Sequence, residues 1–243
     1  MNLENRIENL LQILDQGLSE FDDPDFKIYE ILNFSELFSI VKTEDLDNST
    51  FVYKLERVPD GKIFRDNFLK LYDQTGLNLE RKKVLKDILD LHQKEFYSGS
   101  VTLAYSQIEG VLSDMFVELK AIALNANNTY IKLDVNGSPK LNKKGEEIYL
   151  KGLVSKINHL CEINKKAYNG IIIRNIDPNG SDEQLILNSY ELNFSEKEST
   201  ISSTRNKILH GQDISYFSPK RSAQLILWLY SILDNIVRYK KAP

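Results

Sequence analysis

Hydrophobic residues recur at spacings of three and four along much of the chain, which is the pattern of helices with one buried face. Such segments cover residues 2–20, residues 64–97 with a break at Gly76, and residues 100–126 after a break at Gly99. Apolar side chains occupy most of the circumference of the 100–126 segment. We therefore expect this helix near the centre of a helical bundle.

Two segments near the N-terminus leave the element type open. Residues 26–41 favour a helix, although their Phe, Tyr and Ile residues also suit strands. Residues 49–64 combine partial alternation with the turn signal Pro59-Asp60-Gly61, which allows a hairpin without deciding for one.

Residues 127–194 change from helical periodicity to short alternating runs. Asn136-Gly137 is a strong hairpin turn signal, a short helix is predicted over 150–164, and further β-like runs are broken at residues 177–180. We expect a mixed α/β insertion between two helices of the bundle.

The last two predicted helices have clear start and stop signals. Ser195 and Glu198 form a capping box, and Gly211 suits the left-handed position after a helix. Ser218 and Pro219 mark the next helix start.

The C-terminal helix, predicted over 219–239, has two apolar strips. They consist of Ala223, Ile226, Leu229, Tyr230, Leu233, Ile236 and Val237 on one side and Leu225, Trp228 and Ile232 on the other. Two strips indicate burial on both sides, one in the bundle core and one at a subunit interface.

Composition limits the class of protein. The chain is 42% hydrophobic and 27% charged, as in soluble globular proteins. No apolar run approaches the roughly 18 residues that span a bilayer, and the N-terminal segment lacks a secretory pattern. Cys161 is the only cysteine, so an intramolecular disulfide and multi-cysteine metal sites are excluded. We expect a cytoplasmic protein without a metal ion, other cofactor or membrane partner.

The net charge of −4 hides an uneven distribution. Residues 1–60 hold 14 acidic and 5 basic residues, whereas residues 138–174 hold 8 basic and 3 acidic ones and residues 204–243 hold 7 basic and 2 acidic ones. Such unevenness lets one surface attract a polyanion while the whole molecule stays acidic. Solvated helix faces explain the same distribution equally well.

The segment RNKILHG, residues 205–211, places three chemically useful side chains on one predicted helix. His210 lies in the last turn, where the helix dipole favours a protonated imidazole, so it suits general acid or base catalysis. Asn206 lies four residues earlier, on nearly the same face. Arg205 lies about 140° around the helix from His210, and its guanidinium suits phosphate binding.

These residue types permit metal-independent RNA cleavage, in which the ribose 2′-OH attacks the adjacent phosphate. Arginine stabilises charge on the phosphorus, and histidine moves the protons. One histidine cannot easily act as acid and base together, so we expect a two-fold dimer that brings a second Arg205 and His210 to the same cleft.

The segment RNKILHG before a long C-terminal helix, with AYSQIEGVLSDMF upstream, resembles the HEPN superfamily (higher eukaryotes and prokaryotes nucleotide-binding). These helical domains often carry an Arg-x(4–6)-His motif, frequently as Arg-Asn-x-x-x-His. The resemblance covers roughly residues 78–126 and 195–240. It implies a mainly α fold, with a HEPN-like bundle over residues 76–243. The mixed α/β insertion 127–194 and an extra N-terminal helical or mixed region, 1–75, have no counterpart in the resemblance.

The resemblance also implies a function. It predicts a dimeric endoribonuclease of bacterial toxin–antitoxin, abortive-infection or antiviral defence systems, acting on RNA such as tRNA and controlled by a neutralising or regulatory protein. Arg205, Asn206 and His210 match the motif, and Glu109 corresponds to a supporting acidic residue on the upstream helix.

Other residues were weighed against this site. Lys143, Lys144, Lys151 and Lys207 are candidates for RNA binding. His92 and His159 lack a neighbouring Arg or acid at useful spacing and are expected at the surface or the edge of the core. Two alternatives remain: a catalytically silent RNA- or nucleotide-binding module of the same fold, and a helical interaction module.

Overall fold

The computed structural model describes residues 48–134, 136–152 and 200–241, together with Gln12, Ser155, Lys156 and His159. This part of the chain is mainly helical, so the predicted α-rich class is confirmed. The elements, in chain order, are α3 (Asn48–Glu56), the 3-10 helix η2 (Val58–Asp60), α4 (Lys62–Thr75), α5 (Leu79–Gln93), α6 (Tyr97–Glu118), β1 (Ile122–Leu124), β2 (Tyr130–Lys132), α9 (Thr200–Leu209) and α10 (Pro219–Lys241).

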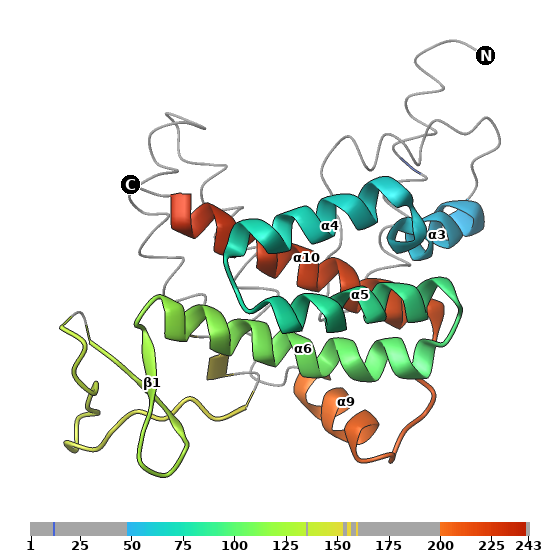
Figure 1. The fold of residues 1–243 in the computed structure, drawn as a ribbon. Helices are drawn as coiled ribbons and strands as arrows, with labels where there is room; N and C mark the ends of the chain where they lie inside the picture. The colour runs from blue at the N-terminus through green and yellow to red at the C-terminus, as the bar shows by residue number, and fades with distance from the viewer. Residues whose placement is uncertain are drawn as a thin grey trace.

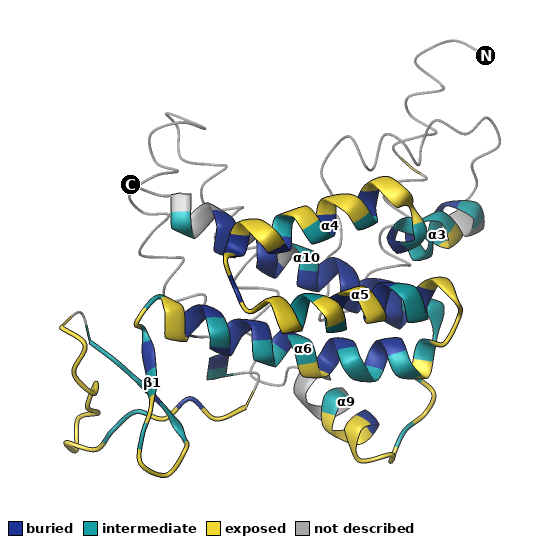
Figure 2. Cartoon of the chain, viewed as in Figure 1, coloured by how far each residue is buried: buried dark blue, intermediate teal, exposed yellow. Residues whose placement is uncertain are grey.

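Helix α10 is the centre of the bundle, with α4, α5 and α6 packed around it (Figure 1). Both of its apolar strips are buried, including Leu229 on one side and Trp228 on the other. The strips lie in one core shared with α6 (Figure 2). The second strip is therefore buried within a single chain, which corrects the expectation that it forms a subunit interface.

Residues 49–64 form α3, η2 and the start of α4, so the hairpin alternative is wrong. Pro59 fits the first turn of η2, where its missing N–H costs no hydrogen bond. Phe51, Phe64 and Phe68 belong to the same core as α10. Residues 48–75, the described end of region 1–75, thus pack into the bundle. The helices predicted over 2–20 and 26–41 lie outside the described residues.

The break between α4 and α5 falls at Gly76, as predicted, with a left-handed φ of 69°. The next break lies at residues 94–96 instead of Gly99, because Glu95 adopts the left-handed turn with φ 63°. Gly99 lies inside α6, and a Cβ there would approach Leu91 Cδ1 to 3.1 Å. The glycine allows close packing of α5 and α6 and does not end a helix.

Helix α6 ends at Glu118, eight residues before the predicted end at position 126. Lys120 turns left-handed, and Ala121 N–H donates to Phe116 O at 2.9 Å, which closes the helix. Residues 122–124 then form β1, which pairs antiparallel with β2.

The predicted turn at Asn136-Gly137 is confirmed. Asp134 Oδ1 accepts the N–H groups of Asn136 and Ser138, and Gly137 has a φ of 78°. A second turn follows over residues 142–145. Most of the predicted 150–164 helix and the β-like runs after it lie outside the described residues.

The stop of α9 and the start of α10 agree with their signals. Gly211 is left-handed, and its N–H donates to Ile208 O at 3.0 Å. Ser218 Oγ accepts the Arg221 N–H at 3.1 Å, and Pro219 begins α10. The capping box at Ser195 lies outside the described residues. In the parts described, no helix is both long and apolar enough to cross a membrane.

Candidate functional site

Helix α9 lies against α6 (Figure 1) and presents different residues to α6 and to solvent. Ile208 is buried in the core, and Arg205, one turn earlier, is half-buried. Asn206, Lys207 and His210 are exposed. Burial of Ile208 therefore sets the rotation of α9, and this rotation turns Arg205 toward α6.

Arg205 forms an ion pair with Glu109 of α6. Its Nη2 donates to Glu109 Oε2 at 2.6 Å, and its Nη1 approaches Asn206 Oδ1 at 3.3 Å. Charge-assisted bonds of this kind are stronger than neutral ones. The structure thus brings together three predicted site residues, Arg205, Asn206 and Glu109.

Lys156 joins the same cluster, although no sequence motif marks it as a site residue. Its Nζ donates to Glu109 Oε1 at 2.9 Å, and its side chain is only 6% exposed. The ammonium also lies 5.1 Å from the ring centroid of Tyr130 in β2, a cation–π contact. One carboxylate therefore serves two cations, one on each oxygen.

His159 lies three residues after Lys156 and is buried against Phe116, with ring centroids 4.9 Å apart. Phe116 follows Glu109 by two turns, so the two residues share one face of α6. Lys156 and His159 thus both contact the face of α6 that bears Glu109.

His210 lies just beyond the last residue of α9 and is exposed to solvent. Its N–H donates to Asn206 O at 2.9 Å. Among the described residues, no hydrogen bond or ion pair involves the imidazole. This separation follows from the angle of about 140° between positions five residues apart. One chain brings Arg205 to Glu109 and leaves His210 toward solvent.

The four lysines predicted to bind RNA are all exposed. Lys143 and Lys144 lie in the 142–145 turn, and Lys151 Nζ lies 5.3 Å from the Tyr149 ring centroid. Lys207 lies on α9. Helix α9 contacts α6, and so does strand β1.

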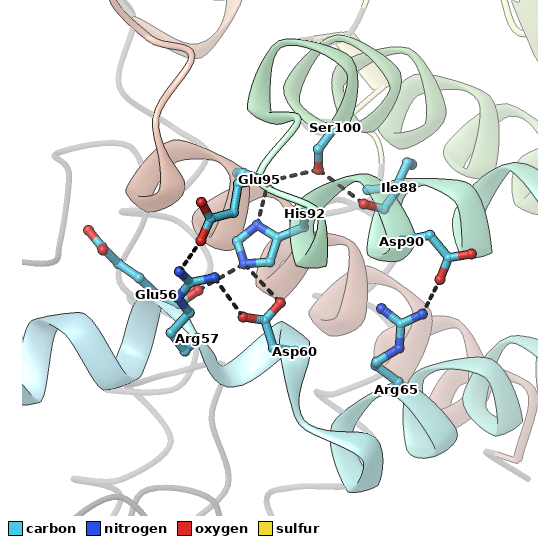
Figure 3. Close-up of polar contacts among 10 residues, drawn as sticks. Glu56, Arg57, Asp60, Arg65, Ile88, Asp90, His92, Glu95 and Ser100 are labelled. Atoms are coloured by element: carbon cyan, nitrogen blue, oxygen red, sulfur yellow. Dashed lines mark hydrogen bonds and ion pairs between the residues drawn. The ribbon is translucent and has the colours of Figure 1, made fainter.

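A second polar cluster surrounds His92, which is 0% exposed, so the expected surface or core-edge position is wrong (Figure 3). His92 Nε2 lies 2.9 Å from Glu56 O, and Nδ1 lies 2.7 Å from Ser222 Oγ. A carbonyl only accepts, so Nε2 carries a proton, and in the neutral ring Nδ1 accepts from Ser222. Ser222 Oγ is also 2.7 Å from Ser100 Oγ.

Burial lowers the pKa of His92, and the nearby Asp60 carboxylate, 3.8 Å away, only partly opposes this effect. His92 is therefore a neutral residue of the core. Because it has no contact with solvent, a substrate cannot reach it, and the candidate site is the cluster on α6 and α9.

No group of three or more His, Cys, Asp or Glu side chains suited to a metal ion occurs among the described residues. Comparison of the chain with protein-family models gave no match. The same holds for the comparisons with curated proteins and with solved structures.

Proposed function

We propose that the chain is a metal-independent endoribonuclease of the HEPN type, active as a homodimer. The observation that supports this most is the arrangement of α9. Its Arg205 is anchored to Glu109 by a 2.6 Å bond, and its His210 is exposed at the end of the same helix. A fixed guanidinium and an accessible imidazole on one short helix are two groups that metal-independent RNA cleavage can use.

In the proposed reaction, the neutral imidazole of one His210 takes the proton of the ribose 2′-OH. The 2′ oxygen forms a bond to phosphorus, and the bond from phosphorus to the 5′ oxygen breaks. The protonated imidazole of the partner's His210 gives its proton to the leaving oxygen. Arg205 stabilises the charge on the phosphate oxygens. The products are a 2′,3′-cyclic phosphate and a 5′-hydroxyl.

The need for a dimer follows from the orientation of these groups. A single chain offers one histidine at this site, on a different side of α9 from Arg205. A two-fold axis near the exposed end of α9 would supply the second imidazole. The proposed substrate is RNA such as tRNA, bound by the exposed lysines. The proposal also includes a neutralising protein partner and a role in bacterial defence or as a toxin.

The test is cleavage of a fluorescently labelled RNA in the presence of a chelator. We expect the wild-type protein to release fragments ending in a cyclic phosphate and His210→Ala to lose at least a hundredfold in rate, roughly the contribution of one general acid or base. Gln212→Ala, an exposed change two residues away, is the matched control and should cleave normally.

Equal cleavage by wild type and His210→Ala would reject the catalytic assignment. RNA binding that weakens with salt, without cleavage by any variant, would instead identify the silent binding module. Growth arrest on expression that disappears with Arg205→Ala would distinguish a toxin from a housekeeping nuclease.

A further inference from the structure

The Glu109 carboxylate is shared between two cations that differ in exposure. Arg205 Nη2 binds Oε2 at 2.6 Å, and the Arg205 side chain is 22% exposed. Lys156 Nζ binds Oε1 at 2.9 Å and is almost fully enclosed, with the Tyr130 ring against it. Only one of the two cations is placed to meet a ligand from solvent.

This sharing bears on how Arg205 could bind a phosphate. If Glu109 were neutralised by Arg205 alone, movement of the guanidinium to a phosphate would leave a half-buried carboxylate without a counter-ion. The same carboxylate would also repel the incoming anion. A second cation on the other oxygen removes both penalties.

We propose that Lys156 is a positioning residue: it neutralises Glu109, so that Arg205 is free to bind the substrate phosphate. The proposal rests on the proposed role of Arg205 in RNA binding. Lys156 itself does not touch the substrate, because its ammonium is enclosed between Glu109 and Tyr130.

Two other roles for Lys156 predict different behaviour. A purely structural lysine would affect unfolding but not affinity for a phosphate ligand in the folded protein. A lysine that bound phosphate directly would cause a loss that no change at Glu109 repairs. Variants at both positions therefore separate the three roles.

The experiment compares wild type, Lys156→Met, Glu109→Gln and the double variant. The probe is an RNA oligonucleotide with 2′-O-methyl groups, which lacks the attacking hydroxyl, and binding is followed by fluorescence anisotropy. Methionine keeps an unbranched apolar side chain in the enclosed site. Lys86→Met, an exposed lysine on α5, is the charge-matched control.

We expect Lys156→Met to weaken binding roughly tenfold, the scale of one charge-assisted hydrogen bond. The double variant should return to within about twofold of wild type, since no carboxylate then competes for Arg205. Lys86→Met should bind like wild type. Unchanged binding in Lys156→Met, or a double variant as weak as the single one, would overturn the proposal.

A measurement without RNA keeps this result separate from the proposed function. Hydrogen exchange of the Arg205 guanidinium, followed by NMR, should slow several-fold in Lys156→Met, because Glu109 then pairs with Arg205 alone. It should quicken in Glu109→Gln. If wild type fails to bind the oligonucleotide, the nuclease proposal fails. The role of Lys156 is tested separately, and it is refuted if the Arg205 exchange rate in Lys156→Met equals that of wild type.

Discussion

His92 is fully buried where four elements of the bundle pack together. Its ring bonds to Glu56 O at the end of α3 and to Ser222 of α10, and through Ser222 it is linked to Ser100 of α6. Asp60 of η2 is the nearest carboxylate, and Arg57 and Arg65 are the nearby cations that oppose protonation. Burial lowers the pKa of His92, so the ring is neutral near pH 7, and Ser222 then donates to Nδ1.

The stability of the protein should therefore fall in mild acid. The pKa of His92 in the folded state lies below its ordinary value of 6.5, and the unfolded chain titrates near that value. Above pH 6.5, His92 is neutral in both states and contributes no pH dependence. Below it, the unfolded state binds a proton that the folded state resists, so the free energy of unfolding decreases until the pH passes the folded pKa.

Urea unfolding at a series of pH values between 7.5 and 5 measures this effect. His92→Gln should remove the part of the slope that belongs to this residue, even though it lowers stability at every pH. Identical slopes in wild type and His92→Gln would contradict the assignment.

The sequence does not predict residue roles that depend on contacts between residues far apart in the chain. Lys156 is 47 positions from Glu109, and no local pattern marks it as a partner. The sequence predicts His92 at the surface or core edge, since its partners, Ser222 above all, come from distant elements. The Arg205–His210 spacing was visible, and so was their angular separation, because both depend on one helix.

At the scale of elements, α9 positions the candidate site, and its end depends on Gly211. That residue has a φ of 69°, and a Cβ there would meet no atom within 4 Å. Gly211→Ala should therefore destabilise the protein by roughly 1 kcal/mol through backbone strain alone. Gly211→Asn should cost less, since asparagine tolerates the left-handed conformation.

Urea midpoints of these two variants test the role of backbone conformation directly. Both substitutions add a side chain in open space, so they differ in conformational preference more than in contacts. Equal losses for Ala and Asn would show that something other than the left-handed backbone sets the cost.

Helix ends were predictable where Gly, Ser or Pro marks them, as at Gly76, Gly211 and Ser218. The ends of α5 and α6 were misplaced because Glu95 and Lys120 carry the left-handed turns. Neither residue type signals such a turn, and the pairing of β1 with β2 overrides the helical pattern that continues past Glu118.

At the scale of the molecule, the buried α10 shows that one chain completes its own core. A dimer would have to form through surface that the single chain leaves exposed, and the outer side of α9 is such a surface (Figure 2). Its exposed residues include Asn206, Lys207 and His210, followed by Ile214 after the helix. A two-fold contact there would place two imidazoles at one site.

This arrangement predicts how activity responds when wild-type and inactive chains are mixed. If each cleavage needs both copies of His210, a dimer with one His210→Ala chain is inactive. After subunit exchange in an equal mixture, random pairing leaves about one quarter of the dimers fully wild type. RNA cleavage should then fall to about a quarter of that of the undiluted wild type at the same total protein concentration.

Gln212→Ala chains, mixed in the same way, should leave the rate per chain unchanged and so control for exchange itself. A rate that falls only to one half would mean that each chain carries a complete site, and the composite site would be excluded. A fall to one quarter therefore shows that one reaction uses an imidazole from each chain. A dimer with two independent sites would give a fall to one half.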